Sequence, residues 1–319
     1  MQTYPLKFEP ILKEKIWGGT RLAAKLNKKT NGKQIGESWE ISGVPENVSV
    51  VVNGDYAGWS LSTLQQEFKS SFLGAENYKR FGNDFPLLIK FLDAAKALSV
   101  QVHPDDAMAQ KHHNCPGKTE MWYIMDHEAD AEIVLGLNQD QKDLGTLQTI
   151  DAQNVNSVFH TEKVTKGASY FIPAGQVHAI GSGILVAEIQ QTSDVTYRIY
   201  DWGRTDSAGN YRELHTDMAI AATKNLQPQV VLPSDTRDTT NPIVNCDYFT
   251  TNELCVNGQT VKDYTTLDSF VIFICTAGNA IITTDQGAVP ITEGETVLLP
   301  ANCCKIDVVG EANLLEVYI

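Results

Sequence analysis

The sequence predicts a mainly β protein with two jelly-roll barrels and a few short helices. Many short apolar runs are separated by Gly, Pro and polar turn residues, and few stretches have helical periodicity. This pattern is typical of β-sandwiches and jelly rolls. Residues 166–178 also resemble residues 293–305, because a Gly, an apolar run and a Pro-Ala pair stand at the same spacing in each. A turn glycine, a strand and a second turn in both segments favour a repeated barrel.

The composition is that of an ordinary globular protein. The chain has 319 residues, of which 42% are hydrophobic and 20% charged, and this balance argues against disorder. Its length suits about two domains. Lys and Arg number 25 against 39 Asp and Glu, so the formal net charge is −14. Nucleic acid and anionic membranes are therefore disfavoured as partners.

Targeting and redox signals are absent from the sequence. The N-terminal residues show no secretory signal pattern, and the most apolar stretches, 85–102 and 270–282, are too short or too charged to span a membrane. The six cysteines have no CxxC or disulfide-framework spacing. These features predict a reduced, cytoplasmic protein. They do not predict its oligomeric state.

The expected elements follow in order along the chain. Short strand-like runs interrupted by Gly occupy the first 50 residues. Near 60–80, apolar residues three to four positions apart stand behind Ser60 and predict a capped helical segment. Residues 105–113 are expected to form one helix, with acidic residues at its positive end and histidines at its negative end. Further strands are predicted at residues 87–93, 97–103, 120–125, 131–135, 168–172, 184–190 and 196–200.

The repeat divides the chain into two expected units. We predict a catalytic unit over residues 1–240, which includes the helical segment, and a C-terminal unit over 241–319. Their boundary is expected near 225–242. The second copy has Lys305 at the position that His178 holds in the first. The first barrel is therefore predicted to bear a metal and the second to be metal-free. The alternative is that so short a repeat arose by chance.

One predicted strand has a polar face. Ser99, Gln101 and His103 alternate with apolar residues, so their side chains leave the same face of the strand. Such a strand lines a polar cavity or faces solvent, and solvent is the default when one strand is taken alone.

Other strands favour the cavity. Glu120 opens an otherwise apolar strand, where an unpaired carboxylate would be costly. His178 follows the Pro-Ala turn, and Glu188 interrupts another apolar run. His103, Glu120 and His178 together form a set of two imidazoles and a carboxylate, which binds Zn²⁺, Fe²⁺ or Mn²⁺ in sites with open positions. Gln101 could add a neutral oxygen.

Basic residues stand close to these strands. Lys118 lies two residues before Glu120, whereas Lys90 and Arg198 interrupt apolar runs. In an acidic protein, such cations indicate an anionic ligand such as a phosphate. The plainer readings are a lysine whose ammonium reaches solvent and an ion pair of Arg198 with Asp194 or Asp201.

Several motifs lie in a recognisable order: Ile16–Gly19, Gly36–Ser42, Leu98–Asp105, Gly117–Trp122, Ile172–Ala179, Gln190–Arg198 and Arg212–His215. Together they resemble the type I mannose-6-phosphate isomerases of the cupin superfamily, in their short bacterial form. They span most of residues 5–216, and residues 243–319 resemble the second, metal-free cupin of that family loosely. The long helical insertion of larger members has no room here.

The resemblance implies roles for individual residues. His103, Glu120 and His178 match the family's metal ligands, with Gln101 as a further ligand in some members. The expected cofactor is one divalent ion per chain, with zinc preferred. The expected catalytic residues are Arg198, Lys118 and Glu188, and the expected substrate-binding residues are Ser99, Lys90 and Asp194.

The implied reaction is the metal-dependent interconversion of mannose 6-phosphate and fructose 6-phosphate through a cis-enediol(ate). A general base must move a proton between C2 and C1, and Glu188, Lys118 and a metal-bound water are the open alternatives. Arg198 would hold the phosphate or the enediolate. A dioxygenase with the same ligands would not need Lys118 and Arg198 beside the metal. The remaining alternative is a catalytically reduced cupin that binds a sugar phosphate as a regulatory module.

Overall fold

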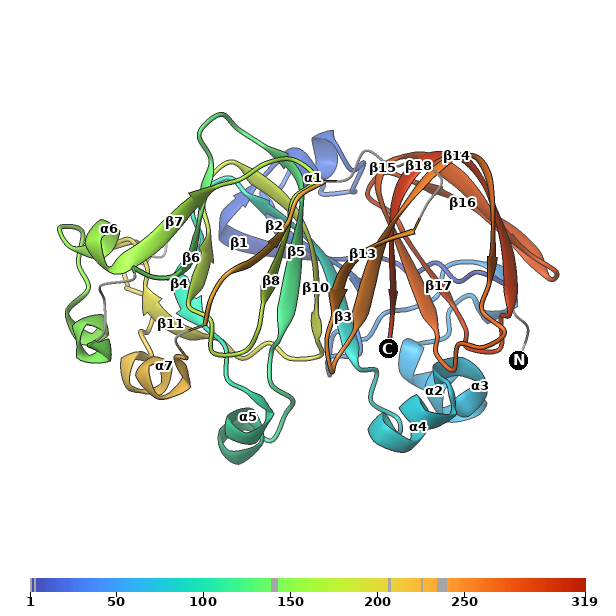
Figure 1. The fold of residues 1–319 in the computed structure, drawn as a ribbon, viewed down its shortest axis with the longest axis horizontal. Coiled ribbons are helices and arrows are strands. Elements are labelled where there is room, and N and C mark those ends of the chain that lie inside the picture. Colours follow the sequence, from blue (N-terminus) through green and yellow to red (C-terminus); the bar gives the residue numbers. More distant parts are fainter. Residues whose placement is uncertain (1, 3, 139–142, 206–207, 225, 234–239) are drawn as a thin grey trace.

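The computed structural model describes residues 2, 4–138, 143–205, 208–224, 226–233 and 240–319 (Figure 1). Strands dominate these ranges and form three sheets with short helices around them, which confirms the mainly β prediction. No helix in the described part of the chain is long and apolar enough to cross a membrane. The six cysteines all lie in the described part of the chain, and no disulfide joins them.

The first sheet has seven strands in the order β1-β2-β3-β10-β5-β8-β12. Its strands are β1 (Ile11–Gly19), β2 (Ile35–Ile41), β3 (Leu87–Ala94), β5 (Glu120–His127), β8 (Ser169–Ile172), β10 (Ile184–Gln191) and β12 (Gln229–Val231). The β3, β5 and β10 strands are buried along almost their whole length. Polar side chains on these strands therefore need partners inside the protein.

The second sheet has five strands in the order β11-β4-β9-β6-β7. Its strands are β4 (Val100–Val102), β6 (Glu132–Leu137), β7 (Phe159–Lys163), β9 (His178–Ile180) and β11 (Tyr197–Tyr200). Trp122 and Ile124 of the first sheet share a hydrophobic core with Ile133 and Leu135 of the second. The two sheets thus pack against each other, and the candidate site lies at one end of this core.

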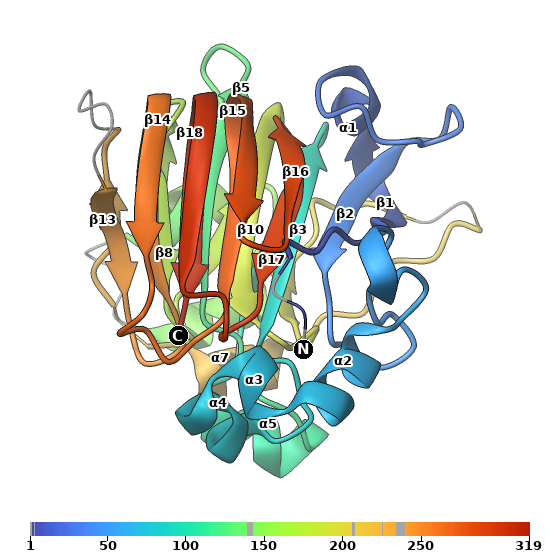
Figure 2. The same cartoon turned by 90° about the vertical axis from the view of Figure 1, so that its right-hand side faces the viewer.

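The third sheet belongs to the C-terminal part of the chain, drawn in orange and red in Figures 1 and 2. It contains β13 (Thr240–Asn245), β14 (Thr250–Asp263), β15 (Val271–Thr284), β16 (Gly287–Thr292), β17 (Thr296–Leu299) and β18 (Lys305–Tyr318). Strand β18 pairs with both β14 and β15. Their inward residues, such as Phe273 and Leu314, form a separate core.

Short helices lie at the ends of the sheets, and those in the expected segment near 60–80 are confirmed. The helices are α1 (Arg21–Ala24), α2 (Leu61–Phe68), α3 (Ser70–Leu73), α4 (Ala75–Phe81), α5 (Asp106–His113), α6 (Val155–Val158) and α7 (Thr216–Ala222), with 3-10 turns η1 (Gly54–Tyr56) and η2 (Leu144–Thr149). The backbone N–H of Thr63 donates to the Ser60 hydroxyl at 3.1 Å, so Ser60 caps α2 as expected.

The strand predicted at 97–103 is shorter in the structure, where β4 covers only Val100–Val102. Side chains take the backbone carbonyls that would have continued the ladder. Arg204 donates to the carbonyl of Ala97 at 2.6 Å, and the Trp202 indole donates to that of Leu98 at 2.6 Å. These long-range contacts end the strand early.

The sequence repeat corresponds to a repeated backbone. In the first copy β8 is followed by a turn and β9, and in the second β17 is followed by a turn and β18. Gly167 has φ +84° and Gly294 has φ +85°, a region that side chains disfavour. Lys305 occupies the position that corresponds to His178, and it is exposed at the surface.

The N-terminal and C-terminal parts of the chain pack tightly together. Leu6 exchanges backbone hydrogen bonds of 2.9 Å with Leu298 of β17, and the rings of Phe85 and Phe270 lie 4.9 Å apart. The expected boundary near 225–242 includes residue 225 and residues 234–239, which lie outside the described residues. The division into units at 240 stays a prediction.

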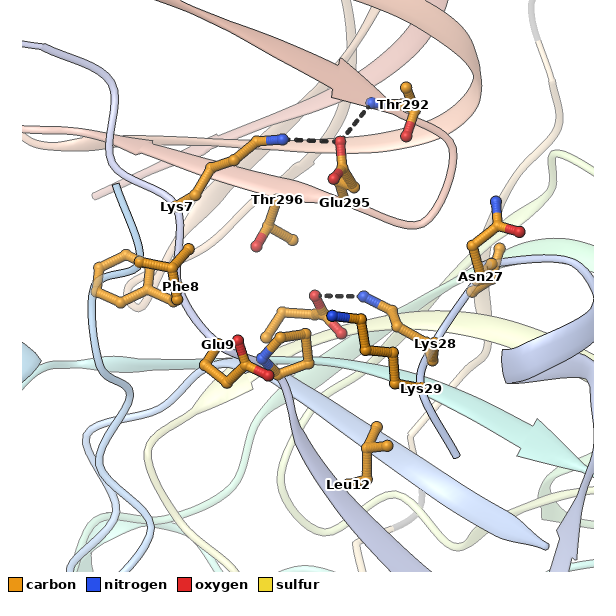
Figure 3. Close-up of a pocket in the computed structure, with 14 residues that line it drawn as sticks. Lys7, Phe8, Glu9, Leu12, Asn27, Lys28, Lys29, Thr292, Glu295 and Thr296 are labelled. Carbon is orange, nitrogen blue, oxygen red and sulfur yellow. Dashed lines mark hydrogen bonds and ion pairs between the residues drawn. The ribbon is translucent and has the colours of Figure 1, made fainter. Parts of the chain in front are cut away.

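A cavity of about 280 Å³ lies where the two parts meet (Figure 3). Two ion pairs border it: Lys7 and Glu295 at 2.9 Å, and the buried pair of Lys28 and Glu40 at 2.7 Å. Glu40 belongs to β2, whose residue Glu37 lines a different cavity, the one at the candidate site. Strand β2 therefore separates the two cavities.

Candidate metal centre

The expected metal ligands come together in the structure. His103 directly follows β4, His178 begins β9, and Glu120 begins β5 of the other sheet. The Nε2 atoms of the two histidines lie 3.2 Å apart, and the Glu120 carboxylate lies 3.4 Å from His103 and 3.5 Å from His178. All three side chains are buried. Among the His, Cys, Asp and Glu side chains of the described residues, these three have the spacing to hold a metal ion.

Backbone carbonyls orient both imidazoles. The Nδ1 atom of His103 lies 2.9 Å from the carbonyl of Val195, and that of His178 lies 2.8 Å from the carbonyl of Gln176. A proton on each Nδ1 satisfies these carbonyls and leaves Nε2 as the free ligand atom. Burial lowers the pKa of His103 to about 3 and also lowers the pKa of His178. Both rings therefore offer a neutral nitrogen at physiological pH.

The carboxylate of Glu120 is suited to a cation. Burial alone would raise its pKa, but the nearby charge of Lys118 holds the pKa of this carboxyl well below its usual value. Its Oε2 is buried and accepts no hydrogen bond of good geometry from a described residue, although the Lys118 ammonium lies 2.8 Å away. Two neutral imidazoles and an ionised carboxylate fit a divalent metal.

Two predicted polar residues stand beside the ligands. The amide nitrogen of Gln101 lies 3.4 Å from Nε2 of His178, so this side chain is placed where it could supply a further ligand. The ammonium of Lys118 lies 3.0 Å from Nε2 of His103 as well as beside Glu120. The sequence predicts that Ser99, Gln101 and His103 share one face of a strand. The Ser99 hydroxyl lies 3.4 Å from the side-chain oxygen of Gln101, as a common face requires.

A cavity of about 270 Å³ opens beside the candidate metal ligands. Predicted residues from both sheets line it: Lys90, Ser99, Gln101, Lys118, Glu188, Asp194 and Arg198. The structure thus brings every predicted site residue either into the ligand cluster or onto the wall of one cavity. Lysine and arginine side chains outnumber the carboxylates on this wall, which suits an anionic ligand.

Arg198 does not form the ion pairs considered as alternatives. Its Nη1 donates to the carbonyl of Glu213 at 2.7 Å, and its Nε is buried without a hydrogen-bond partner among the described residues. Asp201 pairs with Arg204 and Arg212 instead. The guanidinium of Arg198 therefore keeps donors available on the cavity wall.

Glu188 and Lys90 form a buried ion pair on this wall. Their charged atoms lie 3.2 Å apart, and the indole of Trp122 donates to Glu188 at 3.1 Å. Burial raises the pKa of Glu188. Burial alone would lower the pKa of Lys90, but the carboxylates of Glu188 and Glu37 raise it above its usual value.

Sequence reasoning missed several residues of this cavity: Lys15, Trp17, Glu37, Thr196 and Arg212. Trp17, Glu37 and Arg212 belong to motifs that supported the family resemblance, so these motifs could have pointed to them as site residues. Glu37 accepts a hydrogen bond from its near neighbour Trp39 at 2.6 Å and lies 3.2 Å from Lys15. Glu37 and Trp39 alternate along a strand, and this alternation could have shown that both side chains leave the same face.

Comparisons with known proteins agree with this geometry. The model of the type I phosphomannose isomerase catalytic domain matches residues 6–142, and that of the mannose-6-phosphate isomerase cupin domain matches residues 238–319. The chain is 36% identical to mannose-6-phosphate isomerase ManA of Bacillus subtilis (strain 168) over the full length of both.

Solved structures have the same fold. The crystal structure of the mannose 6-phosphate isomerase from Bacillus subtilis matches the whole chain and is itself fully covered, with a TM-score of 0.87 at 32% identity. A structure of a mannose 6-phosphate isomerase bound with zinc and yttrium also matches, with a TM-score of 0.78 at 16% identity. The match covers 98% of this chain and 99% of the other. The full-length sequence relationship decides membership: this chain belongs to the type I phosphomannose isomerase family of enzymes.

Proposed function

We propose that this protein is a metal-dependent aldose–ketose isomerase that interconverts mannose 6-phosphate and fructose 6-phosphate through a cis-enediol(ate). The observation that carries the proposal is the buried cluster of His103, Glu120 and His178 beside a cavity lined by cations. The relatives of this chain are named mannose-6-phosphate isomerases.

Zinc is the proposed ion. Two imidazole nitrogens and a carboxylate oxygen are common zinc ligands in sites that keep a position open, and one structure of the same fold is described as bound with zinc and yttrium. A divalent ion held by this cluster supplies positive charge that stabilises a developing oxyanion. Gln101 is proposed as the further ligand because its amide lies beside His178.

The cavity residues are proposed to bind and orient the sugar phosphate. Arg198 offers a permanently charged guanidinium with free donors, which fits a phosphate or an enediolate. Ser99, Lys90 and Asp194 line the same cavity and are proposed as substrate-binding residues. The Ser99 hydroxyl can donate to or accept from sugar hydroxyls, the Asp194 carboxylate can accept from them, and the Lys90 ammonium contributes positive charge.

Glu188 is proposed as the general base that moves the proton between C2 and C1. Its carboxylate lies on the cavity wall, and burial raises its pKa, which brings it closer to the range of an efficient base at neutral pH. Lys118 is the less suitable base because its side-chain nitrogen already lies 2.8 Å from the Glu120 carboxylate. Lys118 is proposed to stabilise negative charge instead.

The test is a coupled assay for fructose 6-phosphate formation from mannose 6-phosphate, before and after metal removal with EDTA. We expect turnover that EDTA abolishes and that stoichiometric zinc restores. Glu188→Gln should lower kcat by ~10²-fold or more, the scale of one general base. Tight binding of mannose 6-phosphate without turnover would contradict the proposal and favour a regulatory module.

A further inference from the structure

The segment that carries Lys118 and Glu120 is held against the start of α5. The N–H of Lys118 donates to the carbonyl of Pro104 at 3.1 Å. A side chain at Gly117 would place a Cβ 2.6 Å from the backbone nitrogen of Asp106, so only glycine lets the two segments approach this closely. The position of the Lys118 backbone therefore depends on residues 104–106.

Asp106 is the centre of this contact. The first turn of α5 is capped by Asp105, which accepts from the N–H of Met108 at 3.0 Å, so Asp106 is available for other partners. Its Oδ1 accepts from the N–H of Gly117 at 2.8 Å and from the side-chain amide of Gln191 at 3.0 Å. One carboxylate oxygen thus joins α5, the Lys118 segment and the end of β10.

Gln191 completes the hold from the other side of Lys118. The side-chain oxygen of Gln191 accepts from the backbone N–H of Thr119 at 2.8 Å. The backbone N–H of Gln191 donates to the backbone carbonyl of Thr119 at 3.1 Å. The amides on both sides of Lys118 are therefore bound, one by Asp106 directly and one by a glutamine that Asp106 orients.

The second oxygen of Asp106 is bound by the C-terminal part of the chain. The hydroxyl of Tyr248, in the turn between β13 and β14, donates to Oδ2 at 2.9 Å. This turn is itself fixed, because the N–H of Cys246 donates to the carbonyl of Phe249 at 3.1 Å and Arg80 donates to the carbonyl of Asp247 at 2.9 Å. Burial and the hydrogen bond to Asp106 raise the pKa of Tyr248 to about 12, so its hydroxyl stays a donor.

We propose that Tyr248 is a positioning residue for the reaction: through Asp106 it fixes the backbone around Lys118. The metal-free C-terminal sheet thereby contributes to the active site through one hydroxyl, without touching the substrate. This inference rests on the proposed function, in which Lys118 stabilises negative charge. A charge acts effectively only when it is held in place before the reaction begins.

The test compares Tyr248→Phe and Asp106→Asn with Lys7→Gln in the full-length, metal-loaded protein. Lys7→Gln removes a different contact between the two parts of the chain, the ion pair with Glu295, which has no link to the Lys118 segment. Four quantities are measured: hydrogen exchange of the amides at 117–120, kcat, KM and bound metal.

Tyr248→Phe should make the amides of Gly117 and Thr119 exchange about threefold to tenfold faster, the scale of one ordinary hydrogen bond, because Tyr248 supports these amides indirectly. Asp106→Asn should have the larger effect because it weakens the direct bond to Gly117. We expect kcat to fall by a similar factor in both, with KM and metal content within about twofold of the wild type. Lys7→Gln should change none of the four.

Unaltered exchange at these amides in Tyr248→Phe would overturn the inference, as would faster exchange with an unaltered kcat. An equal loss of kcat in Lys7→Gln would also overturn it, because the effect would then be general to the contact between the two parts. If the wild-type chain shows no isomerase turnover, the proposed function fails. The exchange data would still decide whether Tyr248 holds the segment.

Discussion

Glu188 of β10 lies directly opposite Lys90 of β3, and their charged atoms are 3.2 Å apart. Both side chains are almost fully buried, on neighbouring strands of the seven-stranded sheet. Each charge is therefore the main compensation for burying the other, and removal of one leaves an unpaired charge in a region of low polarity.

The stability of this pair can be tested by a double-mutant cycle. Lys90→Met and Glu188→Gln should each lower the free energy of unfolding by ~3 kcal/mol, whereas the double variant should lose much less than the sum. Chemical denaturation measures all four proteins. Lys79→Met is the matched control, because its pair with Glu76 is exposed, and it should cost less than ~0.5 kcal/mol. Additive losses in the cycle would contradict a coupled pair.

The proposed metal ligands give a second prediction. His103→Ala and His178→Ala should each lower metal content and turnover together, because three ligands are needed to hold the ion. His112→Ala is the control, since His112 is exposed on α5, and it should keep both. Metal is measured by plasma mass spectrometry after gel filtration. Stoichiometric metal in both His103→Ala and His178→Ala would show that the ligand assignment is wrong.

Arg198→Ala should leave a folded protein with normal metal content and lower kcat/KM by ~10²-fold or more, the scale of one preorganised donor to a developing charge. Arg198→Lys should restore little, because a single ammonium does not reproduce the forked geometry of a guanidinium. Steady-state kinetics and circular dichroism separate lost activity from lost folding. Near-normal turnover by Arg198→Ala would refute the role given to this side chain.

Metal retention should extend into mildly acidic solution. An ordinary histidine is half protonated near pH ~6.5, and a protonated imidazole cannot bind metal. Burial lowers the pKa of His103 to about 3 and lowers that of His178, and the pKa of Glu120 is also lowered. All three ligands thus keep their metal-binding forms as the pH falls below 6.5. Dialysis across a pH series should give a release midpoint well below that value, and a midpoint near it would contradict the burial argument.

One metal ion per chain is the expected stoichiometry. Lys305 replaces the histidine of the repeat, is exposed and pairs with Asp263 at 3.4 Å. In the described residues, the metal-capable cluster lies in the N-terminal part of the chain. Zinc titration of the wild type should saturate at one equivalent, and the double variant His103→Ala/His178→Ala should bind none tightly. One tightly bound equivalent in that double variant would reveal a site elsewhere.

Strand periodicity explains how much of the site could be predicted. The alternation of Ser99, Gln101 and His103 places three side chains on one face by geometry alone. A lone glutamate in an apolar strand, such as Glu120, signals an internal partner for the same reason that burying a bare charge is costly. These arguments need only local sequence, and the structure brings the residues concerned together.

Contacts between distant segments could not be predicted in the same way. The early end of β4 depends on Arg204 and Trp202, more than a hundred residues along the chain from the carbonyls that they bind. The hydrogen bond from Tyr248 to Asp106 joins residues 142 positions apart. Tyr248 belongs to no periodic pattern, so only the packing of the sheets reveals this contact.

The ring contact between Phe85 and Phe270 has a consequence for unfolding. Both rings are fully buried within one apolar cluster that also includes Leu6, Leu298 and Val317. If either part of the chain unfolded alone, the other would present this apolar surface to water, at a cost that grows with the area exposed. Melting of the two parts is therefore thermodynamically linked, and calorimetry should record a single cooperative transition with equal van't Hoff and calorimetric enthalpies.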